Sequence, residues 1–222
     1  MPTIAAGVVK FQKETFPKHK DLFEKLATGQ EPEALFITCS DSRIDPSMMT
    51  STEPGQLFIC RNAGNIVPPH TTATGAMTAS IEFAVGALKV PHIVVCGHTE
   101  CGAMKGAMNL DALSSLPHTK EWLSFSAAAV AVVNEKGANM PDPEKMHLLI
   151  QENVLLQLQH LRTHPTVAAA LAAGRVKLHG WVYDIKTGAV EAYDEDKNAF
   201  TPVEERYAAE VAAFAERNTH GH

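Results

Sequence analysis

Basic residues and long apolar runs are what this sequence lacks most clearly. Its 19 lysine and arginine residues are outnumbered by 25 aspartate and glutamate residues, so the formal net charge is −6 and no electrostatic footprint for nucleic acid or an anionic membrane is present. No apolar run approaches the length of a membrane-spanning helix; the stretch from Ala127 to Val133 is among the longest. The N-terminus has no basic start followed by an apolar core, so we expect no secretory signal.

Cysteine is also scarce. Four cysteines in 222 residues do not make a disulfide framework, which favours a reducing, cytoplasmic location. The apolar content of 45% and the charged content of 20% are those of an ordinary globular protein with a substantial core. We expect a single domain over residues 1–222, comprising an N-terminal helical arm at 1–30, an α/β core at 31–200, and a C-terminal helix and tail at 201–222.

Strand-like and helix-like patterns alternate along the chain. Strands are expected at 34–39, 57–60, 92–96, 176–183 and 189–193, the last two forming a hairpin at a sheet edge. Helices are expected at 7–27 (broken at Pro17), 72–88, 101–109, 119–135, 144–162, 165–173 and 202–216. The alternation predicts an α/β fold with a central, mostly parallel β-sheet flanked by helices. In such folds, ligands bind beyond the carboxyl ends of the strands.

The first expected strand runs into the sequence CSDSR at residues 39–43. Because successive side chains of an extended chain point to opposite sides, Cys39, Asp41 and Arg43 are expected to share one side. A thiol, a carboxylate and a guanidinium would then converge at one strand end. A catalytic pair and a strand-end salt bridge both account for Asp41 and Arg43, and the residues alone do not decide between them.

A second polar cluster, GHTECG at residues 97–102, follows the strand expected at 92–96. If a helix begins here, the three-residue step from His98 to Cys101 puts both side chains on one face, beside free N–H groups that include that of Gly102. Thiolate and imidazole suit zinc, and three protein ligands leave a fourth position open, as in catalytic sites. Cys39, His98 and Cys101 are therefore a candidate zinc site, although a lone buried cysteine is more often a packing residue.

The other cysteines and several histidines lack such a pattern. Cys60 and Cys96 lie inside apolar strands, where a structural role is expected. His92, His164 and His179 are isolated in the sequence and are interpreted as satisfied polar groups or surface residues.

Three motifs, in this order and at these separations, resemble those of the beta-class carbonic anhydrases: CSDSR at 39–43, RNAGNIVPP at 61–69 and GHTECGAMKG at 97–106. PGQLF at 54–58, GAMTASIEFAVGALKV at 75–90 and LHGWVYDIKTG at 178–188 extend the resemblance over about residues 20 to 195. It implies that Cys39, His98 and Cys101 hold one Zn²⁺ per chain and that Asp41 and Arg43 form the catalytic dyad. It also implies a catalytic homodimer in which the N-terminal arm wraps over the partner, with tetramers as dimers of dimers.

The resemblance implies reversible hydration of CO2 to bicarbonate and a proton. Zinc would acidify a water to the hydroxide that attacks CO2, and two thiolate ligands would blunt this effect, so activity should favour alkaline pH. Asp41 would orient the hydroxide, while Arg43 would keep Asp41 ionised and correctly turned.

The expected substrate pocket departs from the family at one position. Gln30 and Phe58 match a glutamine and a phenylalanine of members whose site stays open, whereas Phe83 replaces a tyrosine. With these residues we place Gly102, at the expected helix N-terminus, in the substrate-binding set.

A second departure concerns a switch found in other members, in which the aspartate becomes the fourth zinc ligand at low pH. Those members have a bicarbonate pocket built from tryptophan, arginine and tyrosine. Arg61 and Tyr183 match the last two, but Phe36 stands where the tryptophan would be. We therefore expect a site that stays open.

Two other functions stay open at this point. The same zinc hydroxide would attack carbonyl sulfide or carbon disulfide, and the sequence does not show the pocket width that would discriminate among these substrates. A non-catalytic, zinc-stabilised assembly protein is the third possibility. The pair Asp41 and Arg43 and the open fourth position argue against it.

Overall fold

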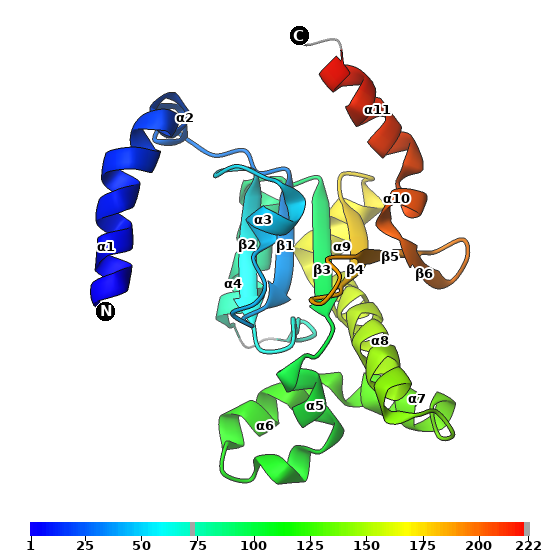
Figure 1. Cartoon of the computed structure of the whole chain (residues 1–222). Coiled ribbons are helices and arrows are strands. Elements are labelled where there is room, and N and C mark those ends of the chain that lie inside the picture. Colours follow the sequence, from blue (N-terminus) through cyan, green and yellow to red (C-terminus); the bar gives the residue numbers. More distant parts are fainter. Residues whose placement is uncertain (72–73, 220–222) are drawn as a thin grey trace. The chain divides into compact units, whose positions relative to one another are not determined.

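The structure, a computed structural model, describes residues 1–71 and 74–219, with side chains described as far as Ala215 (Figure 1). The expected tail beyond Thr219 lies outside the described residues. The chain divides into two compact units, Met1–Glu31 and Pro32–His222. None of the helices in the described part of the chain combines the length and the hydropathy that a membrane crossing requires.

The N-terminal unit is helical. Helix α1 (Pro2–Lys10) continues through a π-helical turn (Phe11–Thr15) and a 3₁₀ turn (Phe16–His19) into α2 (Lys20–Leu26). The irregular turns surround Pro17, where the ring removes a backbone donor. Within this unit the rings of Phe11, Phe16 and Phe23 contact one another, with Phe16 and Phe23 stacked at 5.2 Å. No residue of α1 or α2 is buried.

The second unit is built on a six-stranded sheet in the order β2-β1-β3-β4-β5-β6. Its strands are β1 (Ala34–Cys39), β2 (Leu57–Asn62), β3 (His92–His98), β4 (Lys177–Tyr183), β5 (Val190–Asp194) and β6 (Ala199–Pro202). The first four are parallel, and β5 and β6 are antiparallel additions. The expected α/β class with a mostly parallel sheet is confirmed. The hairpin expected at the sheet edge is displaced inward, because β6 forms that edge.

Helices pack on both faces of the sheet. Figure 1 shows α4 (Ala76–Glu82) and α9 (Pro165–Ala172) behind the sheet and α3 (Pro46–Thr50), which was not expected, in front of it. The long helix α8 (Asp142–Arg162) packs on β3 and β4. The other helices are α5 (Gly102–Met108), α6 (Pro117–Leu123), α7 (Ala127–Lys136), α10 (Val203–Arg206) and α11 (Ala208–Thr219), with a π-helical segment at Phe83–Ala87 and 3₁₀ turns at Leu110–Leu113 and Ser124–Ser126.

The two central strands position the candidate site. Every residue of β1 is buried, as is every residue of β3 after His92, because both sheet faces are covered. The parallel register pairs Thr38 with Cys96. Cys39 and His98, the last residues of their strands, therefore reach the same carboxyl edge of the sheet.

Candidate metal centre

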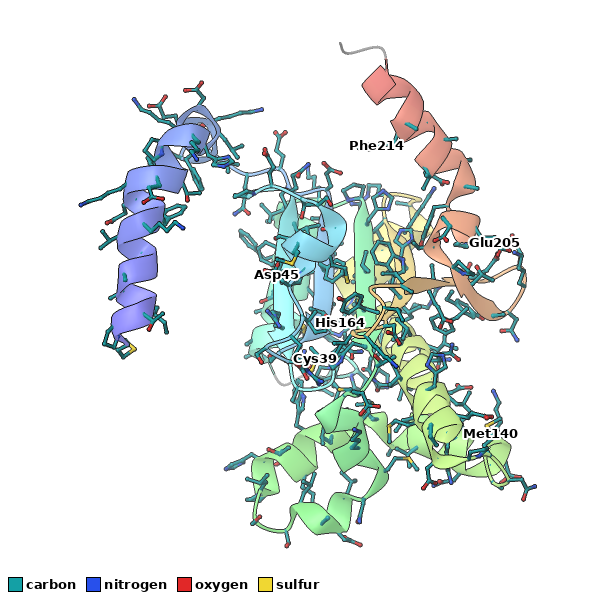
Figure 2. All side chains as sticks on the ribbon, viewed as in Figure 1. Cys39, Asp45, Met140, His164, Glu205 and Phe214 are labelled. Carbon is teal, nitrogen blue, oxygen red and sulfur yellow. The ribbon has the colours of Figure 1, made fainter. Side chains whose placement is uncertain are left out.

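A tight turn follows Cys39. Figure 2 shows Cys39 at the lower end of β1, where the chain leaves the sheet. The backbone N–H of Arg43 donates to Asp41 Oδ1 at 3.0 Å, and that of Ile44 donates to the Asp41 carbonyl at 3.0 Å. The expectation of an extended chain through Arg43 is wrong, because the Asp41 side chain satisfies a local backbone donor and so favours a turn.

Asp41 and Arg43 form a two-point ion pair. Arg43 Nε donates to Asp41 Oδ1 at 2.9 Å, and its Nη2 donates to Oδ2 at 2.7 Å. The same Nη2 also donates to the carbonyl oxygen of Glu100 at 3.2 Å, which ties the pair to the turn after β3. The Arg43 guanidinium, helped by the Arg43 backbone N–H, holds the pKa of the Asp41 carboxyl well below its usual range.

His98 and Cys101 lie on either side of a turn. Glu100 has a left-handed backbone, with φ of 58°, Cys101 is extended, and α5 begins only at Gly102. The expected placement of His98 and Cys101 on one helix face is therefore wrong: His98 ends a strand and Cys101 precedes the helix. Glu100 is a non-glycine residue in the left-handed region, which carries a strain cost that the surrounding contacts must offset.

The His98 ring presents one nitrogen to the interior. Its Nδ1 donates to the carbonyl oxygen of Thr99 at 2.8 Å, which leaves Nε2 of the neutral ring with a free lone pair. Nε2 is buried and has no hydrogen-bond partner within the described part of the chain. A metal-binding histidine almost always uses its other nitrogen in this way, because the hydrogen bond fixes the ring for the ligand bond.

Three ligand atoms converge at this edge. The sulfur atoms of Cys39 and Cys101 are 4.0 Å apart, and these two atoms and a His98 ring nitrogen all lie within 4.8 Å of one another. Asp41 Oδ2 lies 4.0 Å from His98 Nε2, next to the group but engaged by Arg43. The structure thus brings together all three residues expected to bind metal.

The charge at this cluster fits a divalent cation. The hydrogen bond from the Cys101 thiol, with help from His98 and the Gly64 N–H, lowers the pKa of Cys39 to about 4 despite its burial. The same hydrogen bond and burial raise the pKa of Cys101. These opposite shifts favour ionisation of Cys39 before Cys101, whereas a divalent ion would stabilise both as thiolates. Two thiolates and one imidazole with a free lone pair are a donor set for zinc.

Arg61 has a structural contact that the sequence interpretation missed. Its Nε donates to the carbonyl oxygen of Cys39 at 3.0 Å, and its Nη2 donates to that of Asp41 at 2.7 Å. The guanidinium therefore braces the turn that carries the first ligand and the ion pair. Phe36 and Tyr183, considered with Arg61 as a bicarbonate pocket, belong to a small apolar cluster on the sheet. Nothing in the sequence around Arg61 signals its contacts, because they depend on the turn geometry.

The residues expected to bind substrate are dispersed over the chain. The rings of Phe58 and Phe83 lie 6.0 Å apart, and Phe83 is 49% exposed. Gly102 is exposed at the start of α5. Gln30 belongs to the N-terminal unit. Substrate binding by these four residues stays a prediction.

The remaining cysteines are buried as expected. Burial raises the pKa of Cys60 and raises that of Cys96 to about 12, so both are inert thiols. His92 and His179 are satisfied polar groups, as interpreted, and they satisfy each other across neighbouring strands, since His92 Nδ1 lies 3.0 Å from His179 Nε2. His164 is a satisfied polar group whose Nε2 lies 3.0 Å from the carbonyl oxygen of Pro68.

Known proteins resemble this chain over most of its length. A family model described as carbonic anhydrase matches residues 34–190. Carbonic anhydrase 1 of Escherichia coli O157:H7 is 47% identical over 203 residues, which cover 91% of this chain and 92% of that protein.

Two solved structures add to this likeness. The beta-carbonic anhydrase CcaA superposes with a TM-score of 0.89 at 42% identity, covering 91% of this chain and 98% of that one. A tetrameric beta-carbonic anhydrase of Sordaria macrospora superposes with a TM-score of 0.72 at 33% identity, covering 90% of this chain and 94% of that one.

Proposed function

The chain belongs to the beta-carbonic anhydrase family, and from this premise we propose that it hydrates CO2 reversibly to bicarbonate and a proton at a zinc centre held by Cys39, His98 and Cys101. The observation that carries the proposal is the buried Nε2 of His98, which has no hydrogen-bond partner among the described residues and lies beside two sulfur atoms and a fixed carboxylate. A purely structural ion pair would not require an orphaned imidazole nitrogen next to it.

A zinc ion bound there would supply the Lewis acidity that makes water a nucleophile, at a more alkaline pH than a site with three neutral ligands. Asp41 accepts a hydrogen bond from the attacking water through its carboxylate and turns the water toward the carbon of CO2. Arg43 keeps this carboxylate ionised and fixes its plane through two hydrogen bonds of 2.9 and 2.7 Å. Arg61 holds the carbonyl groups of Cys39 and Asp41, so the turn does not rotate the carboxylate away.

The same ion pair favours a site that stays open. For Asp41 to reach a metal, Arg43 must release both of its bonds to the carboxylate, together with the bond from Arg43 Nη2 to the Glu100 carbonyl. A ligand shifts such an equilibrium only by its differential affinity for the two states. With Phe36 in place of an indole, the bicarbonate pocket that would favour release lacks one donor. We therefore expect the hydration rate to fall with pH as a single titration, without a cooperative loss.

CO2 is small and apolar, which suits a pocket walled by aromatic rings. Phe58 and Phe83 are in contact and supply such a surface. The backbone of Gly102 is proposed as a polar member of this pocket, where it would contact an oxygen atom of CO2 or bicarbonate. Substrate binding by Gln30, in the N-terminal unit, stays a prediction.

We expect a homodimer at least, with a tetramer as a dimer of dimers. Exposed apolar side chains of the N-terminal unit support this, among them Ile4 (66%), Val8 (52%) and Phe11 (42%). The tetrameric relative from Sordaria macrospora is in keeping with it. Light scattering of the purified protein at micromolar concentration tests it, and a folded, active species of 24.0 kDa would contradict it.

The direct test of function is stopped-flow measurement of CO2 hydration before and after treatment with a zinc chelator. We expect activity that the chelator removes and added zinc restores. Carbonyl sulfide offered to the same preparation serves as a competing substrate, and faster turnover of it than of CO2 would overturn the proposal. We further propose a cytoplasmic location, where a reducing environment keeps Cys39 and Cys101 available as ligands.

A further inference from the structure

Helix α8 carries a buried polar stripe that contacts the loop beside Cys39. Asn153 is 1% exposed and Gln157 is fully buried, and both reach from α8 to residues 63–67. Burying an amide side chain is unfavourable unless its polar atoms are paired, so such residues in a helix-sheet core require a compensating role. The contacts on the loop define that role.

The order of donors and acceptors along this stripe is fixed by chemistry. The backbone N–H of Val67 only donates, and it donates to Gln157 Oε1 at 2.9 Å, so the Gln157 amide nitrogen faces Asn153. Gln157 Nε2 and Ser126 Oγ both donate to Asn153 Oδ1, at 2.9 and 2.8 Å. Asn153 Nδ2 is thereby turned to the carbonyl oxygen of Gly64, to which it donates at 3.1 Å.

A tryptophan holds the adjacent peptide group. Trp122 Nε1 donates to the carbonyl oxygen of Ala63 at 2.9 Å. This carbonyl and the Gly64 N–H belong to one planar peptide unit and point in opposite directions, so fixing the carbonyl fixes the N–H. The Gly64 N–H donates to Cys39 Sγ at 3.4 Å.

Gly64 is suited to this position by its backbone and its surroundings. Its φ of 81° lies in the left-handed region, and a Cβ atom there would meet Met104 Cε at 2.9 Å and Ala103 Cβ at 3.2 Å. The close approach lets the loop lie against α5, next to the sulfur atom. The peptide groups on both sides of Gly64 are thus held from outside, by Trp122 and by Asn153.

We infer that Trp122 and Asn153 are positioning residues for the metal centre, acting through the Gly64 N–H on the Cys39 thiolate. A hydrogen bond to a ligating sulfur withdraws electron density from it and fixes its direction, so these side chains tune the metal without touching it. The inference rests on the proposed zinc site and adds to it two residues that do not contact the ligands. The hydrogen bonds, not the packing of the side chains, carry the effect.

The chain offers a matched pair of variants for the test, because it has two tryptophans. Trp122→Phe removes the indole N–H and keeps an aromatic ring against Phe125. Trp181→Phe removes the other indole N–H, which donates to the Tyr207 hydroxyl at 3.2 Å, away from the loop. Asn153→Ala removes the hydrogen bond to the Gly64 carbonyl. The variant with both Trp122→Phe and Asn153→Ala tests whether the two hydrogen bonds act on the same Gly64 N–H.

The probe is cobalt(II) in place of zinc, read by the sulfur-to-cobalt charge-transfer absorption. We expect Trp122→Phe and Asn153→Ala to shift this absorption to longer wavelength and to speed metal loss to a chelator roughly 10- to 100-fold. The double variant should show less than the sum of the two shifts, since both act on one N–H. Trp181→Phe should match the wild type in both measurements.

The outcomes separate this inference from the proposed function. A wild-type spectrum without sulfur-to-cobalt absorption would overturn the metal centre itself, and the inference with it. Normal absorption that Trp122→Phe leaves unshifted, with metal loss as slow as in Trp181→Phe, would overturn the inference alone. The conservative Trp122→Phe change keeps the test decisive even if Asn153→Ala fails to fold.

Discussion

Strand β3 begins and ends with a histidine, and the two lie in different surroundings. At its carboxyl end, His98 donates Nδ1–H to the Thr99 carbonyl, and its buried Nε2 has no partner in the part of the chain that the structure describes. At its amino end, His92 Nδ1 lies 3.0 Å from His179 Nε2. Both ends of one strand therefore bring ligand-type side chains together across neighbouring strands.

At the amino end of β3, the polar side chains hydrogen-bond to one another. Trp181 Nε1 can only donate, and it donates to the Tyr207 oxygen at 3.2 Å, so the Tyr207 hydroxyl hydrogen is available for His179 Nδ1 at 2.8 Å. His179 Nε2–H then donates to His92 Nδ1. Burial, with His92 as a neighbouring charge, lowers the pKa of His179 to about 4. Both ring nitrogens of His179 therefore have a protein partner.

The comparison shows that residue type alone does not identify a metal site. At the carboxyl end a buried nitrogen lacks a hydrogen-bond partner among the described residues, and the pKa values of two neighbouring thiols shift in opposite directions. At the amino end the same kind of ring is neutral and satisfied. The cysteines repeat the contrast: Cys39 and Cys96 are both buried, yet hydrogen-bond donors lower the pKa of the first while burial raises that of the second.

The largest difference is expected between two variants in which the histidine at one or the other end of β3 is replaced by glutamine. His98→Gln should remove zinc and lower CO2 hydration well over 100-fold, since loss of an outer-shell partner alone costs roughly 10- to 100-fold. His92→Gln should keep full zinc and near wild-type activity. Metal analysis and stopped-flow assays of both variants check this. Equal zinc loss in the two would break the distinction between the strand ends.

A smaller effect is expected at the carboxylate beside the metal group. Asp41→Asn should lower the hydration rate about 100-fold because the orienting acceptor is weakened, while zinc stays bound because Asp41 is not a resting ligand. Asp45→Asn is the matched control: Asp45 caps α3 through the Met48 N–H at 3.1 Å, and asparagine caps equally well. Zinc loss in Asp41→Asn would contradict the assigned role.

Arg43→Lys should lower the CO2 hydration rate roughly 10-fold, because one of the two charge-assisted hydrogen bonds to Asp41 is lost while the positive charge stays. With less support from its partner, the pKa of Asp41 should rise toward its usual range. The activity of this variant should therefore decline further on acidification than that of the wild type. Identical pH profiles would show that the two hydrogen bonds from Arg43 do not control the pKa of the Asp41 carboxylate.

The strands were predictable because their signal is local. Short apolar runs ending at Cys39 and Cys96 mark β1 and β3, and the polar residues after them mark the edge where ligands bind. The turns were not. Asp41 bonds the Arg43 backbone and Glu100 takes a left-handed conformation, so the ligands meet through turns and not through strand alternation or helix spacing.

Other features depend on contacts distant in sequence. His92 and His179 are 87 positions apart, and only the parallel pairing of β3 with β4 brings them together. The contact between Asn153 and Gly64 spans 89 positions and leaves no periodic trace. Strand β6 (Ala199–Pro202) is short and follows a charged turn, so its pattern is too weak to predict.

The smallest effect on catalysis is expected from the histidine pair at the amino end of β3, where acidification should lower the stability of the fold instead. The pKa of His179 is about 4 in the folded protein and ~6.5 when unfolded, so the unfolded chain binds more protons between these values. The free energy of unfolding should fall as pH drops from 6.5 to 4, by on the order of 3 kcal/mol from this residue. Urea unfolding of wild type and His179→Gln should show a shallower pH dependence in the variant. Equal slopes would contradict a buried neutral ring.

The most direct test of the central claim is the zinc content of three purified proteins, the wild type, Cys39→Ser and Cys96→Ala. If Cys39, His98 and Cys101 form a metal centre, the wild type and Cys96→Ala should each hold one zinc per chain. Cys39→Ser should lose the zinc together with CO2 hydration. Full zinc and full activity in Cys39→Ser would contradict this.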